Sequence, residues 1–107
     1  MALGKKVSFD YDGVLTTEKG AETFDRWKAT GDEMYIITAR QERLMGPVYD
    51  FAREHGILRS HVIRVPLGSK WEAVKRLSID KHVDNNPDEL ELIKKNTSAD
   101  AWNVSKL

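Results

Sequence analysis

Residues 7–16, VSFDYDGVLT, decide how the rest of the sequence is interpreted. The alternation of its first residues is typical of a short buried strand, which Asp10 would end. Gly13 follows at a position suited to a tight turn, because glycine adopts positive φ at no steric cost. The stretch therefore predicts a strand whose carboxyl end carries two carboxylates, Asp10 and Asp12, in a turn.

Strand and helix patterns alternate along the remaining sequence. Apolar runs predict strands over residues 5–10, 33–38, 61–65, 81–84 and 99–104. Helical spacing predicts helices over residues 16–30, 41–55, 70–79 and 87–95, with Pro47 as an alternative start of the second and a capping box of Ser69 and Glu72 on the third. This alternation predicts a three-layer, doubly wound α/β fold with a five-stranded parallel sheet, in a single domain spanning residues 1–107.

Composition narrows the classes of function. The 17 basic and 17 acidic residues cancel, so no overall field directs the protein to nucleic acid or to an anionic membrane. The chain has no cysteine, which excludes disulfides, thiolate metal sites and cysteine nucleophiles and fits a reducing cytoplasm, where we expect the protein. We expect no membrane partner, because no apolar run approaches the roughly 20 residues of a membrane span.

Polar residues stand at the predicted carboxyl ends of several strands. These ends share one edge of a parallel sheet, where ligands bind in such folds. The residues are Asp10, Asp12, Thr38, Asp84, Asp88 and, at the start of a helix, Lys70. Clustered carboxylates repel one another, and Mg²⁺, which prefers oxygen ligands, would relieve that repulsion. One carboxylate could then attack phosphorus and another transfer a proton, while the hydroxyl and ammonium groups hold the phosphoryl oxygens.

Four segments, in this order, resemble the motifs of the haloacid dehalogenase superfamily of phosphatases. They are VSFDYDGVLT at 7–16, MYIIT at 34–38, Lys70, and HVDNNPDEL at 82–90. The resemblance covers essentially the whole chain and implies a Rossmann-like fold of the haloacid dehalogenase type without a cap domain. It also implies a Mg²⁺-dependent phosphomonoester hydrolase that acts through an aspartyl-phosphate.

The resemblance implies a role for each matching residue. Asp10 would be the nucleophile and Asp12 the general acid/base, and both would bind Mg²⁺, Asp12 through its backbone carbonyl. Thr38 would hydrogen-bond the transferred phosphoryl group, and Lys70 would neutralise both that group and Asp10.

The fourth motif departs from the commonest family pattern. Asp84 and Asp88 would complete the metal site, but Asn85 stands where many members carry a second adjacent acid. The sequence leaves open whether Asp88 or Asn85 completes the metal shell.

The absence of a cap domain bears on the expected size of the substrate. An uncapped site suggests a large phosphorylated substrate, or closure by another subunit in an oligomer. TAR at 38–40 and ADAWNV at 99–104 resemble, more weakly, the 3′-phosphatase domain of phage-type polynucleotide kinase. Ala39 and Arg40 would then contact the phosphate of a nucleotide or of a nucleic-acid 3′ end, since arginine binds phosphate in a bidentate manner.

Other interpretations of the same residues stay open. The chain could be a non-catalytic metal- or phosphate-binding module of this fold, or could transfer the phosphoryl group to an acceptor other than water. Asp-x-Asp-Gly is also a common turn, and Thr38, Lys70 and Asp88 could serve only as caps or solvated side chains. His55, His61 and His82 share no metal-binding spacing and are predicted to be structural or solvated.

Overall fold

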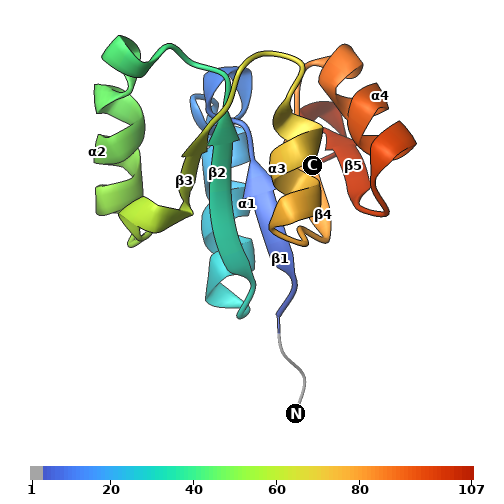
Figure 1. Ribbon diagram of the computed structural model, residues 1–107. Helices are drawn as coiled ribbons and strands as arrows, with labels where there is room; N and C mark the ends of the chain where they lie inside the picture. The colour runs from blue at the N-terminus through green and yellow to red at the C-terminus, as the bar shows by residue number, and fades with distance from the viewer. Residues whose placement is uncertain (1–3) are drawn as a thin grey trace.

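The computed structural model describes residues 4–107, so the first three residues of the predicted domain lie outside the described part of the chain. Five parallel strands form one sheet in the spatial order β3-β2-β1-β4-β5 (Figure 1). The strands are β1 Lys6–Phe9, β2 Glu33–Thr38, β3 Val62–Arg64, β4 Lys81–Asp84 and β5 Asp100–Asn103. The predicted five-stranded parallel α/β fold is confirmed, and β1, which ends in Asp10, is its central strand.

Four helices connect the strands: α1 Glu18–Ala29, α2 Gly46–Glu54, α3 Lys70–Arg76 and α4 Pro87–Asn96. The alternative start at Pro47 is confirmed, since α2 carries this proline in its first turn, where a missing N–H costs nothing. The predicted capping box on α3 is wrong: the Ser69 side chain makes no capping bond, and the Glu72 amide donates to the Ser69 carbonyl at 3.1 Å instead.

The sheet separates two apolar cores, which makes three layers. Helices α1 and α2 cover one face, where Phe24 and Val48 pack against Phe9 and Ile36 of the strands. Helices α3 and α4 cover the other face, and in Figure 1 α3 lies in front of the sheet and α1 behind it. Across residues 4–107, no inserted domain covers the carboxyl edge of the sheet.

Alternation along the strands determines which side chains reach each face. On β1, Val7 and Phe9 enter the core under α1 and α2, so Ser8 points to the opposite face. Ser8 is paired in register with His82 of β4, its neighbouring strand. The centre of the sheet therefore holds two buried polar side chains among apolar ones.

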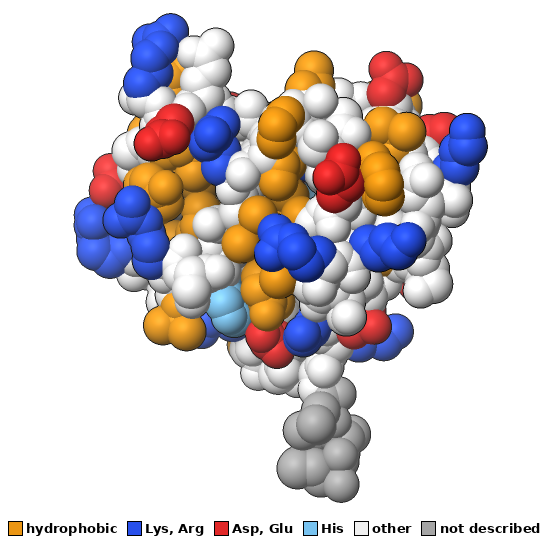
Figure 2. Space-filling model, viewed as in Figure 1, with side chains coloured by type: hydrophobic (Ala, Val, Ile, Leu, Met, Phe, Trp, Pro, Cys, Tyr) orange, Lys and Arg blue, Asp and Glu red, His pale blue; other side chains and the backbone are white. Residues whose placement is uncertain are grey.

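The surface carries both signs of charge. Figure 2 shows lysine and arginine side chains interspersed with aspartate and glutamate over the face that α3 covers. None of the helices in the described part of the chain has the length and apolarity needed to cross a membrane. Recognition of a charged ligand must therefore come from local groups rather than from the overall field.

Candidate functional site at the carboxyl edge of the sheet

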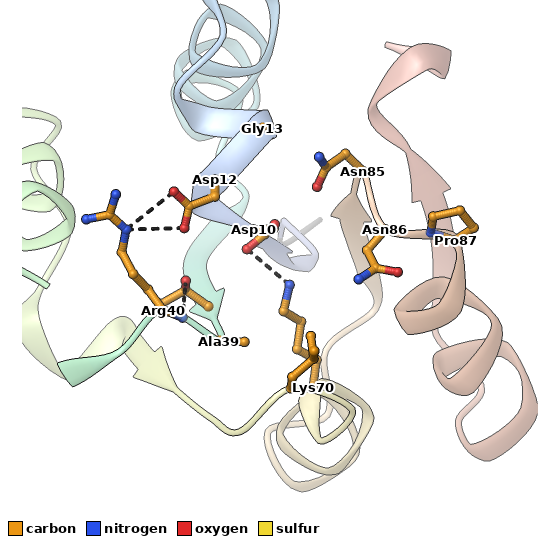
Figure 3. A pocket seen from close by; sticks show the side chains of 11 residues that line it. Asp10, Asp12, Gly13, Ala39, Arg40, Lys70, Asn85, Asn86 and Pro87 are labelled. Atoms are coloured by element: carbon orange, nitrogen blue, oxygen red, sulfur yellow. Dashed lines mark hydrogen bonds and ion pairs between the residues drawn. The ribbon is translucent and has the colours of Figure 1, made fainter. Parts of the chain in front are cut away.

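A cavity of about 540 Å³ opens at the carboxyl edge of the sheet (Figure 3). It brings together residues from the ends of β1, β2 and β4 and from the start of α3, as expected for a doubly wound sheet. Six of the predicted site residues line it: Asp10, Asp12, Thr38, Ala39, Arg40 and Lys70. Two others do not, since Asp84 is buried beneath the cavity and Asp88 lies on the exposed first turn of α4.

The floor of the cavity is a buried ion pair. Lys70 Nζ lies 3.0 Å from Asp10 Oδ1, and the lysine side chain is only 3% exposed. Asp10 is held by the sheet, because its amide donates to the Val83 carbonyl at 2.9 Å and extends the β1–β4 pairing by one residue. The cavity floor therefore has a carboxyl and an ammonium group fixed in position rather than two mobile surface side chains.

Burial and neighbouring charges set the protonation of this pair. Burial, together with the charge of Asp84, raises the pKa of Asp10 to about 7, although Lys70 opposes the change. Burial acts to lower the pKa of Lys70, but the carboxylates of Asp84 and Asp10 outweigh it and leave that pKa raised. The lysine is thus cationic near neutral pH, whereas Asp10 is poised between its two forms.

Asp84 anchors Lys70 from below. Its Oδ2 accepts from Lys70 Nζ at 2.7 Å and from His82 Nε2 at 2.9 Å, while its Oδ1 accepts from the amides of Asn85 and Asn86 at 2.8 and 3.0 Å. Burial alone would raise the pKa of Asp84, but the hydrogen bond from His82 and the charges around it hold that pKa below its ordinary value. Both carboxylate oxygens are therefore engaged by protein donors.

His82 and Ser8 complete the buried network, and neither was predicted as a site residue. His82 is fully buried, so it is not solvated, and its Nδ1 lies 2.7 Å from Ser8 Oγ. Burial lowers the pKa of His82 and favours the neutral ring. The available signal in the sequence was a histidine two residues before Asp84, since residues at i and i+2 of a strand share a face.

A second ion pair forms the rim. Arg40 Nε lies 3.2 Å from Asp12 Oδ2, with the two side chains 25% and 53% exposed, and the Arg40 guanidinium lies 5.4 Å from the centre of the Tyr11 ring. Thr38 orients this segment, because its hydroxyl accepts from the Arg40 amide at 3.1 Å. An exposed pair of this kind is weak and can exchange partners when an anion arrives.

Gly13 and Asn85 close one side of the cavity. Gly13 adopts φ +77°, and a Cβ there would lie 2.2 Å from the Asn85 side-chain nitrogen. The left-handed backbone favours glycine here, and a Cβ would also displace the exposed Asn85 side chain from its place beside the cavity. Asn85, which the sequence left open as an alternative to Asp88 in the metal shell, lines the cavity.

The predicted Mg²⁺ ligands do not gather as one group of side chains. Within residues 4–107, no three histidine, cysteine, aspartate or glutamate side chains form a cluster that could hold a metal. Asp84 has no free oxygen, and Asp88 does not line the cavity. Asp10 and Asp12 remain, and two carboxylates fit Mg²⁺ only where waters and ligand oxygens supply the other positions.

No protein-family model matches the chain, and no curated protein matches it. The fold matches that of a universal stress protein. That solved structure, a universal stress protein in complex with cAMP, superposes with a TM-score of 0.56 at 14% identity, over 95% of this chain and 97% of the other. At this identity the likeness concerns the fold.

This match contradicts the predicted membership of the haloacid dehalogenase superfamily. It also contradicts the predicted functions that rest on that membership: hydrolase or phosphatase activity through an aspartyl-phosphate, and its 3′-end variant. The physical reason is that doubly wound sheets gather polar residues at their carboxyl edge whatever their function, so position alone does not identify a reaction. The structure adds that Asp12 is paired with Arg40 and that Asp84 is fully engaged by Lys70, His82 and the backbone.

Proposed function

We propose that the protein binds a nucleotide through its phosphate group in the cavity at the carboxyl edge of the sheet. One observation carries the proposal: a buried ammonium, Lys70, stands at the floor of an open cavity whose rim holds the guanidinium of Arg40. A buried lysine has lost its hydration, so an anion that reaches it gains a strong charge-assisted hydrogen bond.

Lys70 and Arg40 would contact a phosphate group from different sides. Lys70 acts as a fixed point charge below it, while Arg40 can leave Asp12 and offer two parallel N–H donors from above. The Thr38 hydroxyl also lines the cavity and supplies a further polar contact. This arrangement supports recognition of a phosphate oxygen cluster rather than of a neutral group.

Mg²⁺ is part of the proposal, because charge must be balanced. Asp10 and Asp12 line the cavity, and a nucleotide phosphate adds further negative charge to it. Asp10 and Asp12 would hold the ion, with the phosphate and waters as its remaining ligands. When bound, the ion would neutralise the carboxylates and the phosphate together.

The nucleotide class is supported by the fold and by the open side of the cavity. The universal stress protein that shares the fold has cAMP bound. Leu67, which is 74% exposed, and Pro87 line the cavity mouth and offer apolar surface to a base. Because the cavity is open on this side, the nucleoside would lie near the mouth, away from the charged floor.

Calorimetric titration tests the proposal. We expect 5′-AMP, cAMP and ATP to bind, Mg²⁺ to tighten 5′-AMP and ATP binding, and adenosine, which lacks the phosphate, to bind at least tenfold more weakly than 5′-AMP. Arg40→Gln is expected to weaken 5′-AMP binding about tenfold, the loss of one charge-assisted contact of about 1.4 kcal/mol. Arg53→Gln is the matched control, because Arg53 lies on α2 and is 73% exposed in a pair with Asp50. Equal binding of adenosine and 5′-AMP would contradict the proposal.

A cytoplasmic location belongs to the same proposal. A chain without cysteine fits a reducing compartment, and nucleotides are abundant ligands there. Localisation of a fluorescently tagged chain tests this part.

A further inference from the structure

His82 is a buried histidine on β4, an interior strand where parallel sheets ordinarily carry valine or isoleucine. Its ring makes two hydrogen bonds, one at each nitrogen: Nδ1 with Ser8 Oγ at 2.7 Å and Nε2 with Asp84 Oδ2 at 2.9 Å. Ser8 is its register partner on β1, and Asp84 follows it by two residues on the same face. The sheet itself therefore aligns the three side chains.

The partners determine the tautomer of the ring. An ionised carboxylate can only accept, so the proton must lie on His82 Nε2, which donates to Asp84. The lone pair of Nδ1 then accepts from the Ser8 hydroxyl. Asp84 thus selects the tautomer, and the Ser8 hydroxyl, which can donate or accept, bonds to the opposite nitrogen of the ring.

Asp84 contacts both His82 and Lys70, so the orientation of its carboxylate affects the position of the lysine. Two backbone amides hold one carboxylate oxygen, and His82 shares the other with the Lys70 ammonium, which lies 2.7 Å away. The same ammonium lies 3.0 Å from Asp10 at the floor of the cavity. A lysine side chain has four rotatable bonds, and a carboxylate held by three other donors fixes where the end of that side chain lies.

We propose that His82, braced by Ser8, is a positioning residue that orients Asp84 and thereby fixes the Lys70 ammonium where it meets the ligand phosphate. This inference rests on the proposed nucleotide site for its functional consequence. Its structural part, the coupling of His82 to the Lys70 ammonium, can be measured without a ligand.

Three variants separate positioning from packing. His82→Gln keeps a side-chain N–H at a comparable reach for Asp84, His82→Leu removes both hydrogen bonds, and Ser8→Ala removes the brace. We expect the affinity for 5′-AMP with Mg²⁺ to fall about tenfold in His82→Leu and about threefold in Ser8→Ala, and to stay within twofold in His82→Gln. Affinity for adenosine should not change in any of them, because the nucleoside does not reach Lys70.

Nitrogen-15 spectra of the side chains provide the readout that a purely structural role would not move. In the wild type, the His82 ring should show the Nε2–H tautomer, and the Lys70 ammonium resonance should shift in His82→Leu but not in His82→Gln. An unmoved Lys70 resonance in His82→Leu, or the Nδ1–H tautomer in the wild type, would overturn the inference even if 5′-AMP binds. If 5′-AMP does not bind the wild type, the proposed function fails, and the Lys70 resonance alone decides the coupling.

Discussion

Replacing Asp10 by asparagine is expected to stabilise the protein at neutral and alkaline pH. Burial and the nearby charge of Asp84 raise the pKa of Asp10 from 3.8 to about 7. The folded protein therefore keeps a proton that the unfolded chain has already lost, so the free energy of unfolding falls as pH rises from about 4 to about 7. Asparagine has nearly the same shape, can still accept from Lys70, and removes this cost.

The size of the gain follows from the two pKa values. The folded and unfolded pKa values of Asp10 differ by about 3, and a pKa difference of one corresponds to about 1.4 kcal/mol. The upper limit of the gain in unfolding free energy above pH 7 is therefore about 4 kcal/mol. Water reaches the open side of the cavity, and the effective dielectric constant near such a site is high, so we expect about 1–2 kcal/mol to be realised. The gain should be smaller at pH 5 than at pH 8, because the folded protein still holds part of its Asp10 proton at pH 5.

Urea unfolding followed by tryptophan fluorescence measures this directly at pH 5 and pH 8. Asp100→Asn provides the matched control, because Asp100 is exposed at the start of β5 and should show no gain at either pH. The reasoning is refuted if Asp10→Asn is less stable than the wild type at pH 8, or if its gain is the same at both pH values.

Two further substitutions test the site. Gly13→Ala should cost about 1–2 kcal/mol of unfolding free energy, because alanine is strained in this left-handed turn. It should also weaken 5′-AMP binding, because the new Cβ meets the Asn85 side chain beside the cavity. An unchanged urea midpoint and an unchanged affinity for 5′-AMP would contradict this prediction. Asp84→Asn should cost about 3 kcal/mol at pH 7, since it removes the charge that anchors Lys70. Because folding lowers the pKa of Asp84, the stability that its carboxylate contributes is present above pH 3.8 and is lost as pH falls below that value. The unfolding free energies of the variant and the wild type should therefore converge in acid. A constant difference between them down to about pH 2 would contradict this explanation.

The architecture was predictable because it depends on local patterns. Apolar runs marked each strand, and the strand-helix alternation left a parallel sheet as the simplest arrangement. The same logic correctly brought Asp10, Thr38 and Lys70 to one edge, since the carboxyl ends of parallel strands share it. The starts of α3 and α4 were also predicted, but the predicted Ser69 side-chain cap was wrong, because it depends on a rotamer that no local pattern fixes.

The chemistry of the edge was not predictable in the same way. Asp84 appeared free to bind a metal, because the backbone amides that occupy its Oδ1 cannot be recognised in a sequence. The contact between Ser8 and His82 joins residues 74 positions apart and depends on strand register. Acids at this edge indicate a site, but the reaction inferred from their order was wrong.

The most direct test of the nucleotide site is an amide chemical-shift titration of the nitrogen-15-labelled protein with 5′-AMP and Mg²⁺. We expect saturable shifts at the amides that border the cavity, those of Gly13, Ala39, Arg40, Asn85 and Asn86. A second cavity lies between the end of α3 and the end of α4, and the amides that border it, those of Ser78, Lys95 and Thr97, should not move. Shifts confined to that second cavity, or no saturable shift at millimolar 5′-AMP, would contradict the account.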